Sequence, residues 1–125
     1  MGRQLTESER ALVTAMIERA SVNDGNAVTP EDRRRWLGQV DDLRVVGTCG
    51  CGTCPSIEFV SGDDVGNRLW LEAWDNKQNA GILLFVDNGA LSYLEVYPAD
   101  WKEAGESVAL PRVSDVDFYE PTSSE

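Results

Sequence analysis

The 125-residue chain contains no histidine, and this absence excludes more chemistry than any of its motifs supports. Without an imidazole there is no Ser-His-Asp triad, no Cys-His pair and no histidine ligand for a metal ion. Most routes to hydrolysis at neutral pH are therefore closed. The paired acids at 41–42, 63–64 and 115/117 show no spacing that brings them into one cleft, so we expect a protein that is not an enzyme.

Basic residues are scarce as well, since 11 Lys and Arg stand against 22 Asp and Glu, for a net charge of -11. Residues 1–44 carry 7 Arg against 8 acidic residues, whereas residues 45–125 carry 4 basic against 14 acidic residues. A surface of that sign repels nucleic acid and anionic membranes, and neither is expected as a partner. It attracts basic proteins, or it serves only to keep the protein in solution.

Long apolar runs are also absent. No run approaches the roughly 18 residues of a membrane-spanning helix, and the polar N-terminus lacks the apolar core of a signal peptide. With 42% hydrophobic and 26% charged residues, the composition is that of a soluble globular protein. We therefore expect a single domain over residues 1–125, located in the cytoplasm, with reduced thiols.

Two N-terminal helices are predicted, over about residues 7–20 and 30–41. Thr6 and Glu9 have the spacing of a capping box ahead of an apolar stripe, and Thr29-Pro30 offers an N-cap followed by proline at the first helical position. The arginine run at 33–35 is expected mostly on the solvated side of the second helix, in a structural role.

From Leu43 onward the hydrophobic period changes to two. Five strand-like segments follow, LRVVGT, SIEFVS, RLWLEAWD, GILLFVD and ALSYLEVY. Asp87-Asn88-Gly89 predicts a tight hairpin turn, and the short connections predict antiparallel pairing. The predicted architecture is an α+β fold: two N-terminal helices packed on a five-stranded or six-stranded antiparallel β-meander over about 43–98, with an irregular acidic C-terminal segment over 104–125.

All three cysteines, Cys49, Cys51 and Cys54, lie in the segment VVGTCGCGTCPSI. The C-x-x-C spacing of Cys51 and Cys54 is that of half a structural zinc site. Zinc takes four ligands, and no second cysteine pair exists in the chain. The fourth ligand would have to be a carboxylate such as Glu58, Asp63 or Asp64.

The same segment also fits a purely structural turn. Gly50 and Gly52 allow the backbone of a tight or bulged hairpin loop, in which cysteines pack as small apolar residues. Pro55 and a period-two segment follow, instead of the helix that a thioredoxin-like site needs. We favour the turn and expect no cofactor, while zinc at the three cysteines and a Cys49–Cys54 disulfide under oxidation are the alternatives.

The runs LRVVGTCGCGTCPSIEF and GILLFVDNGALSYLEVYPAD resemble a family of small uncharacterised, mostly actinobacterial proteins. That family has two N-terminal helices, a C-G-C-G-C hairpin and a G-x-L-S-x-L-E-V strand. The resemblance covers about residues 5–98 and implies a fold, with no assigned activity. Thr53 is inserted in the hairpin of this chain, which disturbs any ligand geometry common to the family. The element NGALSYLEVY is also similar to a short strand in several bacterial toxin-immunity proteins.

Strand alternation separates two faces of the predicted sheet. One face receives apolar residues and suits a core under the helices. The opposite face receives Arg68 and the residues predicted to bind a partner, which are Glu58, Trp70, Glu72, Trp74, Tyr93, Glu95 and Tyr97. Aromatic rings among carboxylates are typical of a contact surface for a basic protein. Alternatively, the C-terminal segment with Val108, Leu110, Val113 and Phe118 folds back over Trp70 and Trp74 as a second small core.

These patterns predict a small acidic protein-binding domain. Its most concrete form is an immunity protein that neutralises a basic, nuclease-like toxin domain by occluding the active site. The alternatives are a metal-binding or regulatory module at Cys49, Cys51 and Cys54 and a domain that binds a small ligand on its aromatic face. The sequence leaves the oligomeric state open.

Overall fold

The computed structural model describes residues 3–22, 28–48, 56–59, 68–87, 89–98 and 109–118. Its helical elements are α1 (Glu7–Arg19), α2 (Pro30–Leu37) and the short 3-10 turns η1 (Val40–Asp42) and η3 (Val113–Asp115). Its strands are β1 (Arg3–Gln4), β2 (Ser21–Val22), β3 (Arg44–Val45), β4 (Gly47–Thr48), β5 (Ile57–Glu58), β6 (Arg68–Asp75), β7 (Ala80–Asp87), β8 (Ala90–Pro98) and β9 (Val116–Asp117).

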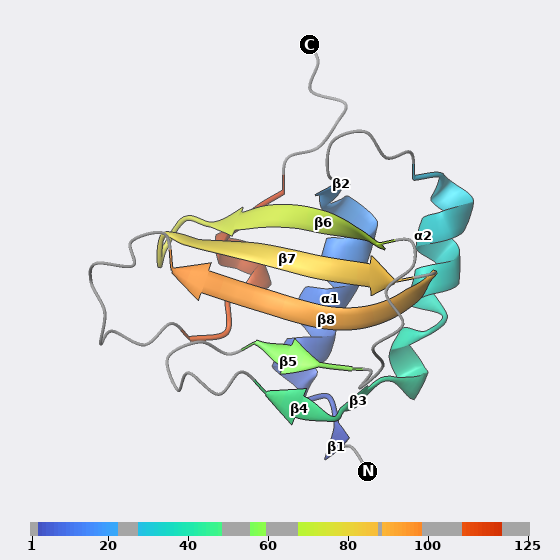
Figure 1. Ribbon diagram of the computed structural model, residues 1–125. Helices are drawn as coiled ribbons and strands as arrows, with labels where there is room; N and C mark the ends of the chain where they lie inside the picture. Colours follow the sequence, from blue (N-terminus) through green and yellow to red (C-terminus); the bar gives the residue numbers. More distant parts are fainter. Residues whose placement is uncertain are drawn as a thin grey trace.

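The main sheet has the strand order β2-β6-β7-β8-β5-β4, with β9 also paired to β6, and every pairing is antiparallel. β1 and β3 form a separate pair. α1 runs behind the sheet in Figure 1, and α2 packs against α1. The predicted α+β class is confirmed. Neither α-helix in the described part of the chain is long and apolar enough to cross a membrane.

The strand order departs from a simple meander at one point. β5 pairs with β8 instead of β6, with Ile57 opposite Leu94 and Glu58 opposite Tyr93. The chain between β5 and β6 spans residues 59–67, which is long enough to pass across the sheet, whereas four or fewer residues join β6 to β7 and β7 to β8. The free edge of β6 is taken by β2 and β9.

α1 begins at the predicted capping box. The Thr6 hydroxyl accepts a hydrogen bond from the Glu9 N–H at 3.1 Å, and the Glu9 carboxylate accepts one from the Thr6 N–H at 2.9 Å. Arg3 on β1 donates to both oxygens of that carboxylate at 2.9 Å. This bidentate pair ties the first strand to the first turn of α1.

The Arg3–Glu9 pair should make the stability of the fold depend on pH. Hydrogen bonds from Arg3 lower the pKa of Glu9 below its ordinary value of 4.5. A group with a lowered folded-state pKa stabilises the fold above its ordinary pKa, and the stabilisation is lost as the pH falls through the folded-state pKa. We expect Glu9→Gln to lower the free energy of unfolding by about 1 kcal/mol at neutral pH and by less at pH 3, measured by urea denaturation.

The matched control for Glu9→Gln is Glu7→Gln, which removes an exposed carboxylate from the same helical turn. Its effect on the free energy of unfolding should stay within about 0.5 kcal/mol. If Glu9→Gln lowered the free energy of unfolding equally at both pH values, the charged Arg3–Glu9 pair would not be the source of the stabilisation.

α2 is shorter than predicted. Its N-cap is Thr29, whose hydroxyl accepts a hydrogen bond from the Asp32 N–H at 3.0 Å, but the helix ends at Leu37 because Gly38 follows as its C-cap and η1 continues the chain. Arg33 donates to the carbonyls of Ile17 and Ala20 at 2.8 and 3.1 Å, which caps the last turn of α1. A structural role for this arginine fits the prediction.

The core lies between α1 and the sheet. Its fully buried side chains come from α1, β6, β7 and β8, and include Leu12, Met16, Ile17, Leu71, Ile82, Leu84 and Leu94. Val113 and Val116 pack against this core, and Phe118 is part of it, with the Arg19 guanidinium 4.4 Å from its ring centroid.

The part of the C-terminal segment around η3 therefore lies on the α1 side of the sheet, where Figure 1 draws it behind the strands, and β9 pairs with the edge of β6. The predicted alternative, a second small core over Trp70 and Trp74, is not formed by residues 109–118, because their apolar side chains join the main core. Val108 is outside the described residues. The segment is also less irregular than predicted, since β9 pairs with β6.

Candidate functional site

The sheet face opposite α1 carries all seven residues predicted to bind a partner. The strand register arranges this face in three rows across β6, β7 and β8, and the first row continues to β5. Phe85, Leu83 and Gly81 occupy the centres of the rows. We call these residues the outer face: Trp70, Phe85, Tyr93 and Glu58 in the first row, Glu72, Leu83 and Glu95 in the second, and Trp74, Gly81 and Tyr97 in the third.

The first row is an aromatic ladder. The ring centroids of Trp70 and Phe85 are 5.8 Å apart, and those of Phe85 and Tyr93 are 6.0 Å apart. Tilted ring pairs at this spacing contribute roughly 0.5–1.5 kcal/mol beyond the area that they bury. The Trp70 Nε1–H donates to Glu72 Oε2 at 3.2 Å and so links the first row to the second. The rings are half-buried, and their mutual packing fixes them on the sheet.

The site residues that sequence reasoning missed lie on β7. Phe85 is the middle rung of the ladder, and Leu83 separates the two carboxylates of the second row. The signal was present in GILLFVD, where alternation places Leu83 and Phe85 opposite the buried Ile82 and Leu84. The prediction assigned no faces to this segment.

Glycine provides room for two of the predicted side chains. A Cβ on Gly81 would lie 2.1 Å from Cζ of Tyr97, so the tyrosine ring lies directly over the glycine. A Cβ on Gly47 would lie 2.4 Å from Oε1 of Glu58. A glycine inside a strand often marks such a close approach, and it is the sequence signal that could have located these contacts.

The charged residues of the three rows are all acidic. The rows contain Glu58, Glu72 and Glu95 and no basic residue. Glu58 is exposed and the other two are half-buried, and no described residue donates a hydrogen bond to the carboxylate of Glu58 or Glu95. Arg68 pairs with Asp87 in the backbone register at the end of β6, but its side chain is outside the described part of the structure. The rows therefore present a negative potential around an apolar centre.

The predicted metal ligands Cys49, Cys51 and Cys54 are outside the described residues, so zinc binding stays a prediction. Within the segments that the structure covers, no group of three or more cysteine and acidic side chains is placed to hold a metal ion.

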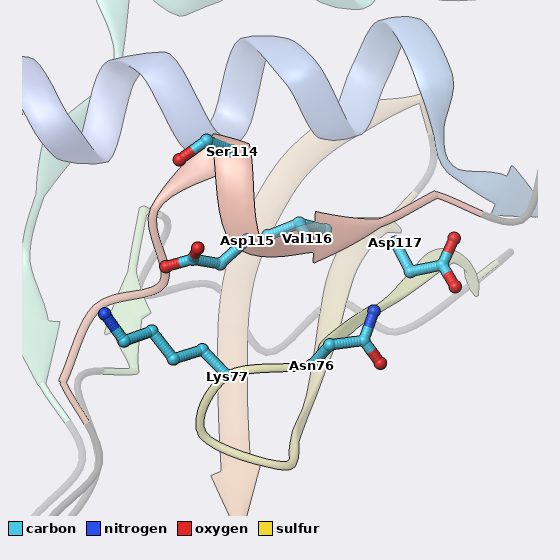
Figure 2. A pocket seen from close by; sticks show the side chains of 6 residues that line it. All are labelled: Asn76, Lys77, Ser114, Asp115, Val116 and Asp117. Carbon is cyan, nitrogen blue, oxygen red and sulfur yellow. The ribbon is translucent and has the colours of Figure 1, made fainter.

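A separate hollow of about 490 Å³ lies where the β6–β7 turn meets η3 and β9 (Figure 2). Asn76 and Lys77 approach it from the turn, and Asp115 and Asp117 from the C-terminal segment. The Asn76 N–H donates to the Asp115 carbonyl at 3.1 Å, so this contact joins two backbones. Asp115 and Asp117 are the carboxylates that line the hollow among the described residues.

A second hollow, of about 460 Å³, lies between the end of α2 and the start of β8. Its polar rim is organised by Gln39, whose side-chain amide donates to the Gly89 carbonyl at 2.9 Å and accepts from the Leu91 N–H at 2.9 Å. Both bonds fix the β7–β8 hairpin to the helical layer. They are structural contacts that join the hairpin to the end of α2.

Comparison with known proteins finds no family model, no curated protein and no solved structure that matches the chain.

Proposed function

We propose that the chain is a protein-binding domain whose outer face docks a basic protein. One observation carries the proposal: three carboxylates and an aromatic ladder occupy the same side of one antiparallel sheet. Aromatic side chains provide area to bury at low entropic loss, and carboxylates steer a cationic partner to the surface. The sheet holds these groups on regular strands, so the surface is formed before the partner arrives.

The most concrete form of the proposal is an immunity protein that neutralises a nuclease-like toxin domain. A nuclease attracts the phosphate backbone of its nucleic-acid substrate with a cationic cleft. An acidic face that enters this cleft occludes the active site, and the aromatic ladder slows dissociation. In this proposal the protein acts in the cytoplasm, is not an enzyme, and needs no cofactor, nucleic acid or membrane.

The proposal predicts an affinity that depends on salt and on two named carboxylates. Against any basic, nuclease-like toxin domain that a neighbouring gene encodes, Glu72→Ala and Glu95→Ala should each weaken binding about tenfold. Raising the ionic strength should also weaken binding, because screening shortens the range of the attraction. Isothermal titration calorimetry in a salt series measures both effects.

The control for these variants is Glu18→Ala, which removes the same charge from the exposed side of α1, behind the sheet. It should change the affinity by no more than about twofold. An affinity that is insensitive to salt and to both outer-face substitutions would contradict the electrostatic mechanism.

A further inference from the structure

We infer that the centre of the outer face is a subsite for one arginine side chain of the basic partner, an inference that rests on the proposed function. Leu83 is the middle residue of the second row, with Glu72 directly opposite on β6 and Glu95 directly opposite on β8. Neighbouring strands are about 4.8 Å apart, so the two glutamate Cα atoms are about 10 Å apart across β7. An apolar side chain thus lies between two carboxylates.

One carboxylate is already oriented. Glu72 Oε2 accepts the hydrogen bond from the Trp70 indole at 3.2 Å, and the indole is packed on Phe85. A carboxylate has about four acceptor positions, so this single bond leaves several for a ligand. The half-buried Glu72 is therefore held in place before any ligand binds.

The second carboxylate is that of Glu95 on β8. Glu95 is half-buried, and among the described residues none donates to its oxygens. A carboxylate that is partly withdrawn from water gains most from donors that carry a positive charge. A bound cation therefore gains most of its binding free energy from the contact with Glu95.

A guanidinium group fits this arrangement better than an ammonium group. It is planar, carries five N–H donors on opposite edges, and can donate to two carboxylates at once. Its faces are weakly hydrated and lie favourably on apolar or aromatic side chains, here Leu83 and its neighbour Phe85. A lysine ammonium is a strongly hydrated point charge and loses more hydration over Leu83.

The test compares an oligoarginine and an oligolysine peptide of equal length as probes of the full chain, by calorimetry at fixed ionic strength. Wild type should bind oligoarginine about tenfold more tightly than oligolysine. This is the difference expected if a guanidinium forms charge-assisted hydrogen bonds to both carboxylates and an ammonium does not. The double substitution Glu72→Gln and Glu95→Gln should reduce this preference to about twofold or less. The indole resonance of Trp70 should shift with oligoarginine, since Trp70 donates to Glu72.

Glu58→Gln is the matched control, because it removes an equal charge from the same face but at the end of the first row. It should weaken both peptides by the same factor and leave the arginine preference intact. Leu83→Arg is the second variant, since it places a guanidinium of the chain itself between the two carboxylates. It should abolish the preference, with circular dichroism confirming the fold.

The outcomes separate the two claims. Equal affinity of wild type for both peptides, with both weakened by Glu58→Gln, would overturn the arginine subsite and leave the basic partner in place. Binding of neither peptide, or binding that no outer-face substitution changes, would overturn the proposed function as well. A preference that survives the double substitution would locate arginine recognition elsewhere and overturn the subsite.

Discussion

Leu84→Ala should lower the free energy of unfolding by about 3–4 kcal/mol, enough to remove much of the stability of a domain of this size. Leu84 is 0% exposed at the centre of β7, directly opposite the buried Leu71 and Leu94. Removing its side chain leaves a cavity in a layer that α1 covers, and such cavities collapse only in part. Urea denaturation followed by tryptophan fluorescence measures the loss.

The adjacent residue provides the control, because Leu83 has the same chemistry on the same strand and points to the other face. Leu83 is half-buried on the outer face, so Leu83→Ala should lower the free energy of unfolding by only about 1 kcal/mol. It should weaken oligoarginine binding instead, because it removes the apolar floor between Glu72 and Glu95. Equal stability losses for the two variants would mean that both faces of β7 are equally buried, which would contradict an open outer face.

Local signals explain why the helix starts could be predicted from the sequence. A capping box involves only residues three positions apart, so Thr6 with Glu9 and Thr29 with Asp32 determine where each helix begins. Period-two alternation is equally local, and it correctly grouped the outward residues of β6 and β8.

The strand order could not be predicted from local sequence patterns. The pairing of β5 with β8 joins segments more than 30 residues apart in the chain, and β2 and β9 are two-residue strands that carry no period of their own. The register shift between Phe85 and Val86 is a further example. It lets both Leu91 and Ser92 be buried, which strict alternation does not allow.

The candidate site was predictable in its composition but not in its geometry. Alternation placed the glutamates and aromatics on one face, while the contact between Tyr97 and Gly81 follows from the register of the β7–β8 pair. The hydrogen bond from Trp70 to Glu72 joins two residues of one strand, but its formation depends on how Phe85 packs the indole. Side-chain contacts of this kind are set by neighbours on other strands.

Asp75→Ala should lower the free energy of unfolding by about 3 kcal/mol, although it only removes an acid at the end of a strand. Asp75 is 1% exposed. One carboxylate oxygen accepts from the N–H groups of Lys77 and Gln78 at 2.9 and 3.2 Å, and the other accepts from Gln78 Nε2 at 2.8 Å. The substitution leaves these donors without their acceptor in the β6–β7 turn, and urea denaturation measures the loss.

The loss should extend to the C-terminal segment through Gln78. Its side-chain amide donates to the Ala109 carbonyl at 2.9 Å and accepts from the Ala109 N–H at 2.8 Å, so Asp75 orients the group that holds residue 109. We expect faster hydrogen exchange at the Ala109 amide in Asp75→Ala. Asp75→Asn should lose about half as much stability. The asparagine oxygen can still accept from the two backbone N–H groups, but its NH2 group and Gln78 Nε2 are both donors and cannot form a hydrogen bond with each other.

The matched control is Asp117→Ala, which removes an exposed carboxylate from β9, the strand paired with the same end of β6, and should change stability by less than about 0.5 kcal/mol. Asp75 follows Trp74 in β6, so a loosened turn should also disturb the third row of the outer face. Folded Asp75→Ala should therefore bind both basic peptides more weakly while keeping the arginine preference, because Glu72 and Glu95 are unchanged. Unaltered stability in this variant would show that its buried carboxylate does not hold the turn.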